Sequence, residues 1–181
     1  LAAVSMVLIL VAGTIVATQL RSSVFESRRT AVLSDAALRF STAQSVFDQS
    51  TASTPDQIQE STRQLATSLR VSASGTGAVS VLLLRSQAQS QSLRINEIVD
   101  PAVLGVVSEE MKNAVAGSTD PQWQSVSIPS ARDANQRVPA ILVGTNVQVP
   151  RAGTHQLYIV YSLQADQERI DTVMGILIFA G

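Results

Sequence analysis

His155 is the sole histidine of the chain, and an imidazole can accept a phosphoryl group or titrate near neutral pH. It stands in the stretch GTHQLYIV at the opening of a predicted strand, which is not the setting of a phosphoacceptor histidine. A chain with one such histidine gives no support to a nucleophile–histidine–carboxylate triad. We therefore predict an ordinary histidine at a strand end, with pH sensing as the alternative.

Four arginines are candidates for binding an anion, because a guanidinium group forms paired hydrogen bonds with carboxylates and phosphates. They are Arg85, Arg94, Arg132 and Arg137. If they gather at one sheet edge, they would bind an anionic ligand such as a cell-wall fragment. Scattered surface arginines are the alternative, which we favour. The candidate ligand-binding residues are thus Arg85, Arg94, Arg137 and His155.

The acidic residues predict neither a metal site nor a catalytic pair. Glu109 and Glu110 are adjacent on a predicted helix, so they point in different directions. Asp133 and Asn135 lie in a polar loop, and calcium would need about 6 to 8 oxygen ligands. We expect no catalytic residue, metal or cofactor in this chain.

Composition narrows the function classes further. The 181 residues suit one domain with membrane anchors, and the net charge of −1 gives no field for nucleic acid. Cysteine is absent, which excludes a disulfide framework and a thiolate metal site.

Two uncharged stretches bracket the chain. Residues 1–20 contain no charged residue and, as a helix, would reach about 30 Å, the thickness of the hydrocarbon core of a bilayer. After Asp171 the chain reads TVMGILIFAG, again without charge. We predict a transmembrane helix over 1–20, a water-soluble domain over 21–172 and the start of a second transmembrane helix over 173–181. A signal peptide over 1–20 is the alternative, but the second apolar stretch speaks against it.

The first helix is expected to continue past the membrane surface, as a membrane-proximal helix over 21–50. This stretch holds no proline or glycine before residue 50, and its apolar residues recur at helical spacing. These apolar residues can pack against the same helix of a second copy, as a dimer seam, or against the domain's own sheet. Both interpretations are open, and both can hold at different positions along the helix. The residues expected to form this signalling or dimer helix are Phe25, Val32, Leu33, Phe40 and Phe47.

Turn and cap signals divide the rest of the chain. Thr54, Pro55 and Gln57 form a predicted N-cap, N1 residue and capping box for a second helix. The stretch AVSVLLLRSQ predicts a strand, whose continuous apolar run is typical of a central position. Asp100 is expected to cap one helix that runs to Gly117.

Three further strands are predicted, WQSVSIP, VPAILVGTNVQV and HQLYIVYSL, the last two joined through PRAGT. Trp123, Tyr158 and Tyr161 are expected to pack inside or to lie at the membrane-proximal rim. Short links favour antiparallel pairing, which indicates an α+β fold with one sheet and helices on one side. This layout resembles the PAS-like (PDC) domains of membrane receptors, in which a long N-terminal helix enters from the membrane.

Three stretches resemble the actinobacterial MtrB-type sensor histidine kinases. They are VLILVAGTIVATQLRSSVFESRRTAVLSDAALRF, VPAILVGTNVQVP and HQLYIVYSLQADQERIDTVMGILI. The likeness covers the layout of the chain from end to end, but it includes no catalytic signature. Neither a phosphoacceptor motif nor a glycine-rich ATP box occurs in these 181 residues.

The resemblance implies a homodimeric, multi-pass receptor of the cell membrane, with residues 21–172 as its extracytoplasmic sensor domain. A cytoplasmic kinase part, absent here, would use ATP and magnesium and pass a phosphoryl group to a response regulator. The implied stimuli are osmotic or cell-envelope stress, and an envelope lipoprotein is an implied partner. The alternatives are a chemoreceptor or cyclase receptor with the same outer fold, and a cell-envelope interaction protein that transmits no signal.

Overall fold

The computed structural model describes residues 2–86, 93–166 and 168. The chain divides into two compact units, one made of residues 1–31 and 165–181 and the other of residues 32–164. The second unit contains the sheet, and it is where a candidate site must be sought.

The long helix α1, Ala2–Asp48, contributes one stripe of buried side chains to the second unit. The stripe repeats every three or four positions, as expected for one face of a helix. Its residues are Val32, Ala36, Phe40, Ala43 and Phe47. Of the predicted signalling residues, Val32, Phe40 and Phe47 thus pack inside their own domain, while Leu33 is half-buried. This supports packing on the domain's own sheet over that stretch.

The helix α2, Pro55–Ser72, begins where the sequence predicts. The Thr54 hydroxyl accepts a hydrogen bond from the Gln57 N–H, and the Gln57 side chain accepts one from the Thr54 N–H. This reciprocal cap satisfies two N–H groups that a helix start leaves without partners. A short 3-10 turn, Ser74–Thr76, then leads into the sheet.

One antiparallel sheet holds all four strands in the order β1-β4-β3-β2. The strands are β1 (Ala78–Arg85), β2 (Gln122–Pro129), β3 (Arg137–Val149) and β4 (Gly153–Ser162). Arg151 and Gly153 adopt positive φ angles of 60° and 80° in the turn between β3 and β4. The predicted α+β class, antiparallel sheet and long N-terminal helix are therefore confirmed.

The predicted central position of β1 is wrong, because β1 is an edge strand. Its apolar run is continuous because both of its faces are covered, so that Leu82 and Leu83 are both almost fully buried. Part of its outer edge is also covered, since Leu83 and Ile98 exchange two backbone hydrogen bonds of 2.8 and 2.9 Å.

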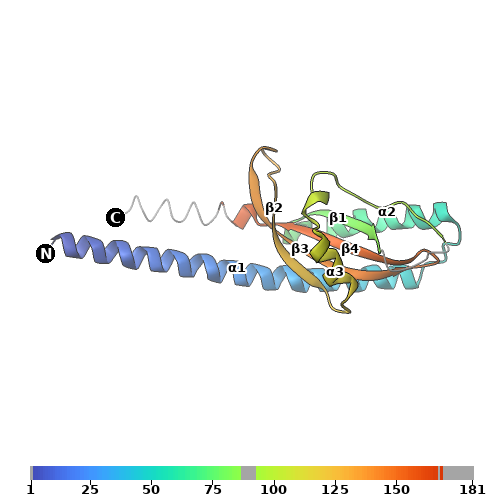
Figure 1. Ribbon diagram of the computed structural model, residues 1–181, viewed down its shortest axis with the longest axis horizontal. Coiled ribbons are helices and arrows are strands. Elements are labelled where there is room, and N and C mark those ends of the chain that lie inside the picture. Colours follow the sequence, from blue (N-terminus) through green and yellow to red (C-terminus); the bar gives the residue numbers. More distant parts are fainter. Residues whose placement is uncertain (1, 87–92, 167, 169–181) are drawn as a thin grey trace. The chain divides into compact units, whose positions relative to one another are not determined.

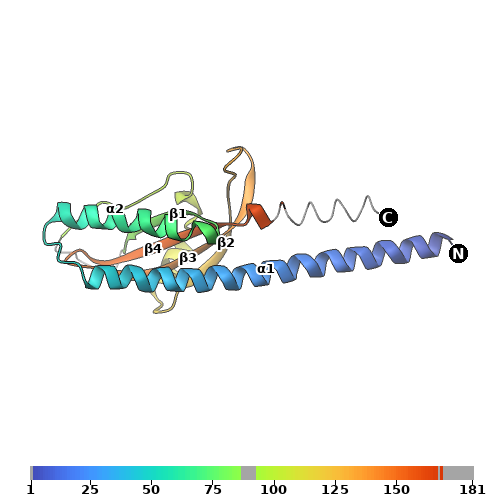
Figure 2. The ribbon, with the colours of Figure 1, turned by 180° about the vertical axis from the view of Figure 1, so that it is seen from behind.

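Helices on one side of the sheet were also expected, and this is corrected as well. The helices α1 and α2 lie side by side on one face (Figure 2). The other face carries α3, Glu109–Ala116, and a 3-10 turn, Leu104–Val106 (Figure 1). A cluster of buried apolar side chains, including Leu82, Met111 and Val160, packs between part of α3 and the sheet.

A single helix from Asp100 to Gly117 does not form. The chain instead becomes extended at Val107, with φ −82° and ψ 92°, and Ser108 starts α3 by accepting a 3.1 Å bond from the Met111 N–H. Asp100 caps only a turn, through a 3.1 Å bond from the Ala102 N–H to its carboxylate. The predicted end at Gly117 is confirmed.

The first unit contains the beginning of α1 and an ion pair of 2.9 Å between Arg28 and Asp166. Phe25 is half-buried there. Where side chains are described, from residue 23 onward, none of the helices combines the length and apolarity needed to cross a bilayer. The predicted start of a membrane helix at residues 173–181 lies outside the described residues.

Candidate functional site

The four candidate arginines do not form one cluster. Arg85 ends β1, whereas Arg137 begins β3 beside β2 at the opposite side of the sheet and donates to the Ser127 carbonyl. Arg132 lies in the connection from β2 to β3, and Arg94 is exposed before Ile95. Among the candidate residues, Arg85 of β1 and His155 of β4 are register partners in the sheet.

Arg85 lines a cavity of about 630 Å³ between the ends of β1 and β4 and the helix α3. Charged and amide side chains surround it, together with Leu84, Leu104 and Ala116. The charged and amide residues among the described lining are Arg85, Glu97, Glu109, Lys112, Asn113 and Gln156. This mixture of both charge signs suits a small polar ligand better than an apolar one.

Most of these polar groups are already held by the protein. The Arg85 N–H donates to the Glu97 carboxylate at 2.8 Å, and its guanidinium donates to the Ile95 carbonyl at 3.0 Å. Lys112 and Glu109 form an ion pair of 2.6 Å. The cavity wall is therefore prearranged, and a ligand would have to compete with these pairs.

Side-chain amides from the sheet attach α3, which forms one wall of this cavity, to β3 and β4. The Gln156 amide donates to the Lys112 carbonyl at 2.8 Å, and the Asn146 amide donates to the Val115 carbonyl at 2.6 Å. The Tyr158 hydroxyl in turn donates to the Gln156 side chain at 3.0 Å. Burial raises the pKa of Tyr158 well above its usual range, so this hydroxyl stays protonated and acts as a fixed donor.

His155 is fully buried beside Arg85. Its Nδ1 lies 3.1 Å from the Gly153 carbonyl, which only accepts, so the proton is on Nδ1. Burial is the main reason why the pKa of His155 is lowered from its usual value. The residue is therefore neutral at pH 7, in keeping with the prediction of an ordinary strand-end histidine.

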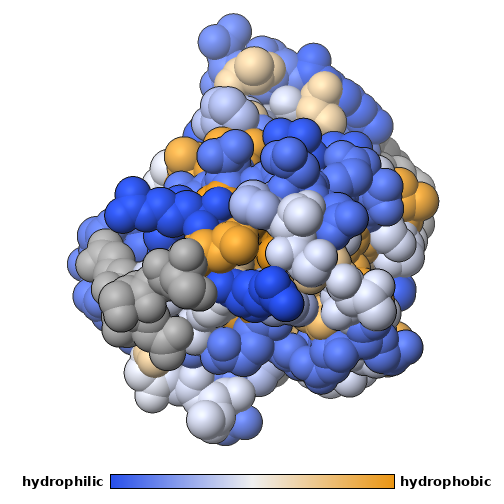
Figure 3. All heavy atoms as spheres, turned by 90° about the vertical axis from the view of Figure 1, so that its right-hand side faces the viewer, coloured by the Kyte–Doolittle hydropathy of each residue, from blue (hydrophilic) through white to orange (hydrophobic). Residues whose placement is uncertain are grey.

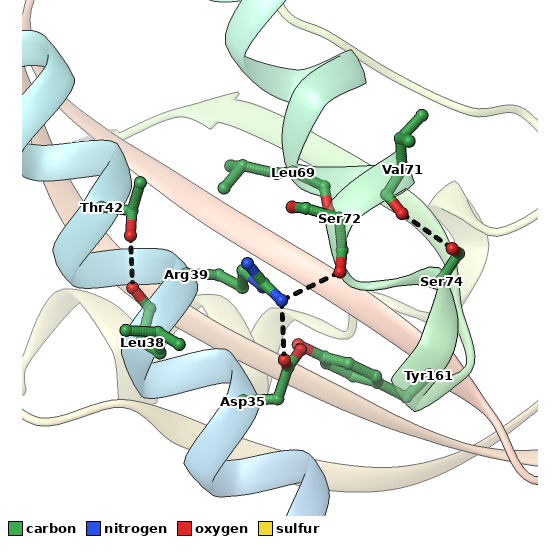
Figure 4. Close-up of polar contacts among 9 residues, drawn as sticks. All are labelled: Asp35, Leu38, Arg39, Thr42, Leu69, Val71, Ser72, Ser74 and Tyr161. Carbon is green, nitrogen blue, oxygen red and sulfur yellow. Dashed lines mark hydrogen bonds and ion pairs between the residues drawn. The ribbon is translucent and has the colours of Figure 1, made fainter.

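A second polar group of residues lies on the other face of the sheet (Figure 4). The Tyr161 hydroxyl of β4 donates to the Asp35 carboxylate of α1 at 3.0 Å. Arg39, one turn further along α1, pairs with Asp35 at 3.1 Å and donates to the Ser72 carbonyl at the end of α2 at 2.9 Å. We call Asp35, Arg39, Ser72 and Tyr161 the α1–β4 network.

The α1–β4 network joins three elements through partly shielded charges. Only 12% of the Asp35 side chain and 22% of the Arg39 side chain are exposed, so water weakens this ion pair less than a surface pair. Burial, followed by the charge of Asp35, raises the pKa of Tyr161, which remains a donor at all ordinary pH values. Sequence reasoning missed this group, although Asp35 and Arg39 stand four positions apart beside the buried stripe.

Within the described ranges, no group of three or more histidine, cysteine, aspartate or glutamate side chains is placed to hold a metal ion. Asp133 instead accepts a 2.9 Å bond from the Asn135 N–H and closes a turn.

The end of the second unit that carries the α1–α2 and β3–β4 connections has a mostly hydrophilic surface, with small separate apolar patches (Figure 3).

Comparison with known proteins adds no assignment, since no family model and no curated relative matches this chain.

Proposed function

We propose that this chain is the extracytoplasmic sensor region of a membrane-bound, homodimeric histidine kinase of a two-component system. In this proposal the second unit is a PAS-like sensor, and α1 is continuous with a transmembrane helix over residues 1–20. The full-length protein would use ATP and magnesium in a cytoplasmic kinase part and phosphorylate a response regulator.

The α1–β4 network is the observation that carries this proposal. It ties together the two elements that lead towards the uncharged stretches at residues 1–20 and 173–181. A shift of β4 along its axis would move Tyr161 and therefore pull on Asp35 of α1. Small shifts of this kind are transmitted when the packing has two discrete arrangements.

The cavity beneath α3 supplies a place where a stimulus could act on β4. Gln156 lines that cavity, and Tyr161 lies five positions along the same strand on the opposite face of the sheet. A ligand that displaces Gln156 from the Lys112 carbonyl would release the strand that holds the network. Arg85 remains a candidate ligand-binding residue on this account, whereas the fully buried His155 does not line the cavity.

A homodimer would use the outer face of α1. Leu38 and Val46 are exposed large apolar residues on that face, at 60% and 43%. Exposed small or uncharged residues surround them, including Ser34, Ala37 and Ser41. Such a face allows a second helix to approach closely, whereas the buried stripe remains with its own sheet.

The first test is to read the gene beyond codon 181, which should encode a phosphoacceptor histidine and an ATP-binding domain. The full-length protein in membranes should then phosphorylate itself from ATP. Asp35→Asn and Tyr161→Phe should each change the rate of this reaction at least about threefold, because each removes one bond of the network. Asp48→Asn, on an exposed carboxylate of the same helix, is the matched control.

Two results would contradict the proposal. One is a downstream gene with no kinase domain. The other is autophosphorylation that neither network variant alters, although urea unfolding shows that both variants have lost stability and so have lost the bonds.

A further inference from the structure

A second hollow, of about 530 Å³, lies between α2 and the first half of the edge strand β1. We call it the α2–β1 groove; its lining includes Arg63, Thr67 and Arg70 of α2, Val81 of β1, and Val99 and Asp100 of the following segment. The helix α2 packs along β1 in this region (Figures 1 and 2). The groove lies apart from the cavity beneath α3 and shares no lining residue with it.

Among the residues that the structure describes, cover of the outer edge of β1 is confined to its second half. Leu83 exchanges both of its backbone hydrogen bonds with Ile98, and the Arg85 N–H is bonded to Glu97. In an antiparallel pair, alternate residues direct their backbone groups to the same side. The N–H and C=O of Val81 therefore point away from β4 and into the groove, where no group of the described residues bonds them.

Two arginines of α2 border this open edge. Arg63 and Arg70 stand seven positions apart on α2, so they share one face of the helix and are separated by a rise of about 10 Å. Both are exposed, and neither forms a hydrogen bond or ion pair with the part of the chain that the structure describes. Arg39 and Arg85, by contrast, are each held by neighbouring groups.

The charge of the groove is positive. Asp100 is the one acidic residue among the described residues that line it, and the Asp100 carboxylate already accepts a hydrogen bond from the Ala102 N–H. The guanidinium groups of Arg63 and Arg70, which no described residue bonds, line the groove, and guanidinium groups prefer carboxylates in paired geometry. The open backbone groups of Val81 add a requirement for an extended main chain, because only a strand offers a complementary N–H and C=O.

We propose that the α2–β1 groove binds an extended acidic segment of a partner protein, which adds to the sheet beside the first half of β1. Its main chain bonds to Val81, and its acidic side chains pair with Arg63 and Arg70. Alternate residues of a strand are about 7 Å apart on one face, so two acidic residues two positions apart come within reach of both arginines. This inference goes beyond the proposed signalling function and does not depend on it.

The test uses the purified full chain and a labelled peptide of about eight residues. In the peptide, valine alternates with polar residues, two of which are glutamates two positions apart. Fluorescence anisotropy should show saturable binding that weakens as salt is added, and inorganic phosphate should compete poorly. Replacing both glutamates by glutamine should weaken binding about tenfold or more.

Two changes then separate the parts of the proposal. Arg63→Gln with Arg70→Gln should weaken binding about tenfold, whereas Arg94→Gln removes an exposed arginine that is not among the described lining residues of the groove and should leave binding unchanged. Methylating the peptide nitrogens on the edge that faces β1 should also abolish binding, because it removes the main-chain donors.

Three results would overturn it. They are equal binding of the glutamine peptide, full competition by phosphate, and undiminished binding of the methylated peptide. Association of the chain with itself in sedimentation experiments, lost in the double arginine variant, would also overturn it by making a second copy the occupant.

Discussion

The two faces of the sheet are attached to their helices in different ways. On one face, α1 and α2 bury a long stripe of apolar side chains. Asp35, which forms a shielded ion pair with Arg39, also accepts a hydrogen bond from Tyr161 of the sheet. On the other face, the eight-residue helix α3 is held by apolar contacts and two side-chain amides, above a cavity of about 630 Å³. The first arrangement suits transmission of force, and the second suits local movement when something binds.

The stripe on α1 should carry the largest single contribution to stability. Phe40→Ala should lower the free energy of unfolding by about 3–5 kcal/mol, because it leaves a cavity where a 5% exposed ring had packed. Leu38 lies two positions before Phe40 and is 60% exposed, so Leu38→Ala should lower the free energy of unfolding by less than about 0.5 kcal/mol. Urea unfolding measures both. Equal losses would contradict the assignment of the buried face.

The α3 face depends on a close approach at Gly144. A Cβ added there would lie 2.4 Å from two atoms of the Tyr158 ring and 3.1 Å from Val115 of α3. Gly144→Ala should therefore cost about 1–3 kcal/mol or more, through displacement of the ring and of the helix above it.

Thermal unfolding with Gly75→Ala as the control checks this, since an added Cβ at Gly75 meets nothing within 4 Å. If both variants were equally stable, the ring and helix would not be packed as described.

The amide bonds that hold α3 should be separable from the rest of the fold. Asn146→Ala removes the donor to the Val115 and Ser118 carbonyls and should cost about 1–2 kcal/mol. Hydrogen exchange should accelerate in residues 109–116 more than in residues 32–48 of α1. Equal acceleration in both segments would show that the helices on the two faces open together, and it would contradict the difference between the faces.

The smallest expected effect is a loss of stability in mild acid. Burial lowers the pKa of His155 in the folded state, so the stability it contributes is present above about pH 6.5 and lost as the pH falls below that value. Arg85 opposes protonation and Glu97 favours it, and both lie beside this histidine.

Unfolding in urea at about pH 7.5 and 5.5 should show this loss in the native chain and a smaller one in His155→Asn. An identical pH dependence in the two proteins would exclude the histidine as its cause.

Sequence reasoning succeeded where the signals are local. The cap at Thr54, the turn around Gly153 and the four strands each depend on neighbouring residues. It failed for β1 because a continuous apolar run has the same pattern in a central strand and in an edge strand covered on both faces. The break before α3 was missed because Asp100 was taken as the helix cap in place of Ser108.

The candidate site was predicted only in part. The sequence analysis named Arg85 and His155, which are paired residues on the adjacent strands β1 and β4. The α1–β4 network joins residues 126 positions apart, and no local pattern records such a contact. The grouping of distant arginines also depends on strand order, which separates Arg85 from Arg137.

The strand order has a consequence for how the chain matures. Of the four described strands, β4 is synthesised last and lies between β1 and β3, so β1 has no strand beside it in the sheet until β4 has left the ribosome. Its apolar side chains must meanwhile be shielded by α2 or by a chaperone. Truncation before Gly153 should accordingly leave an aggregating product, whereas the hairpin of β3 and β4 can form as soon as it emerges.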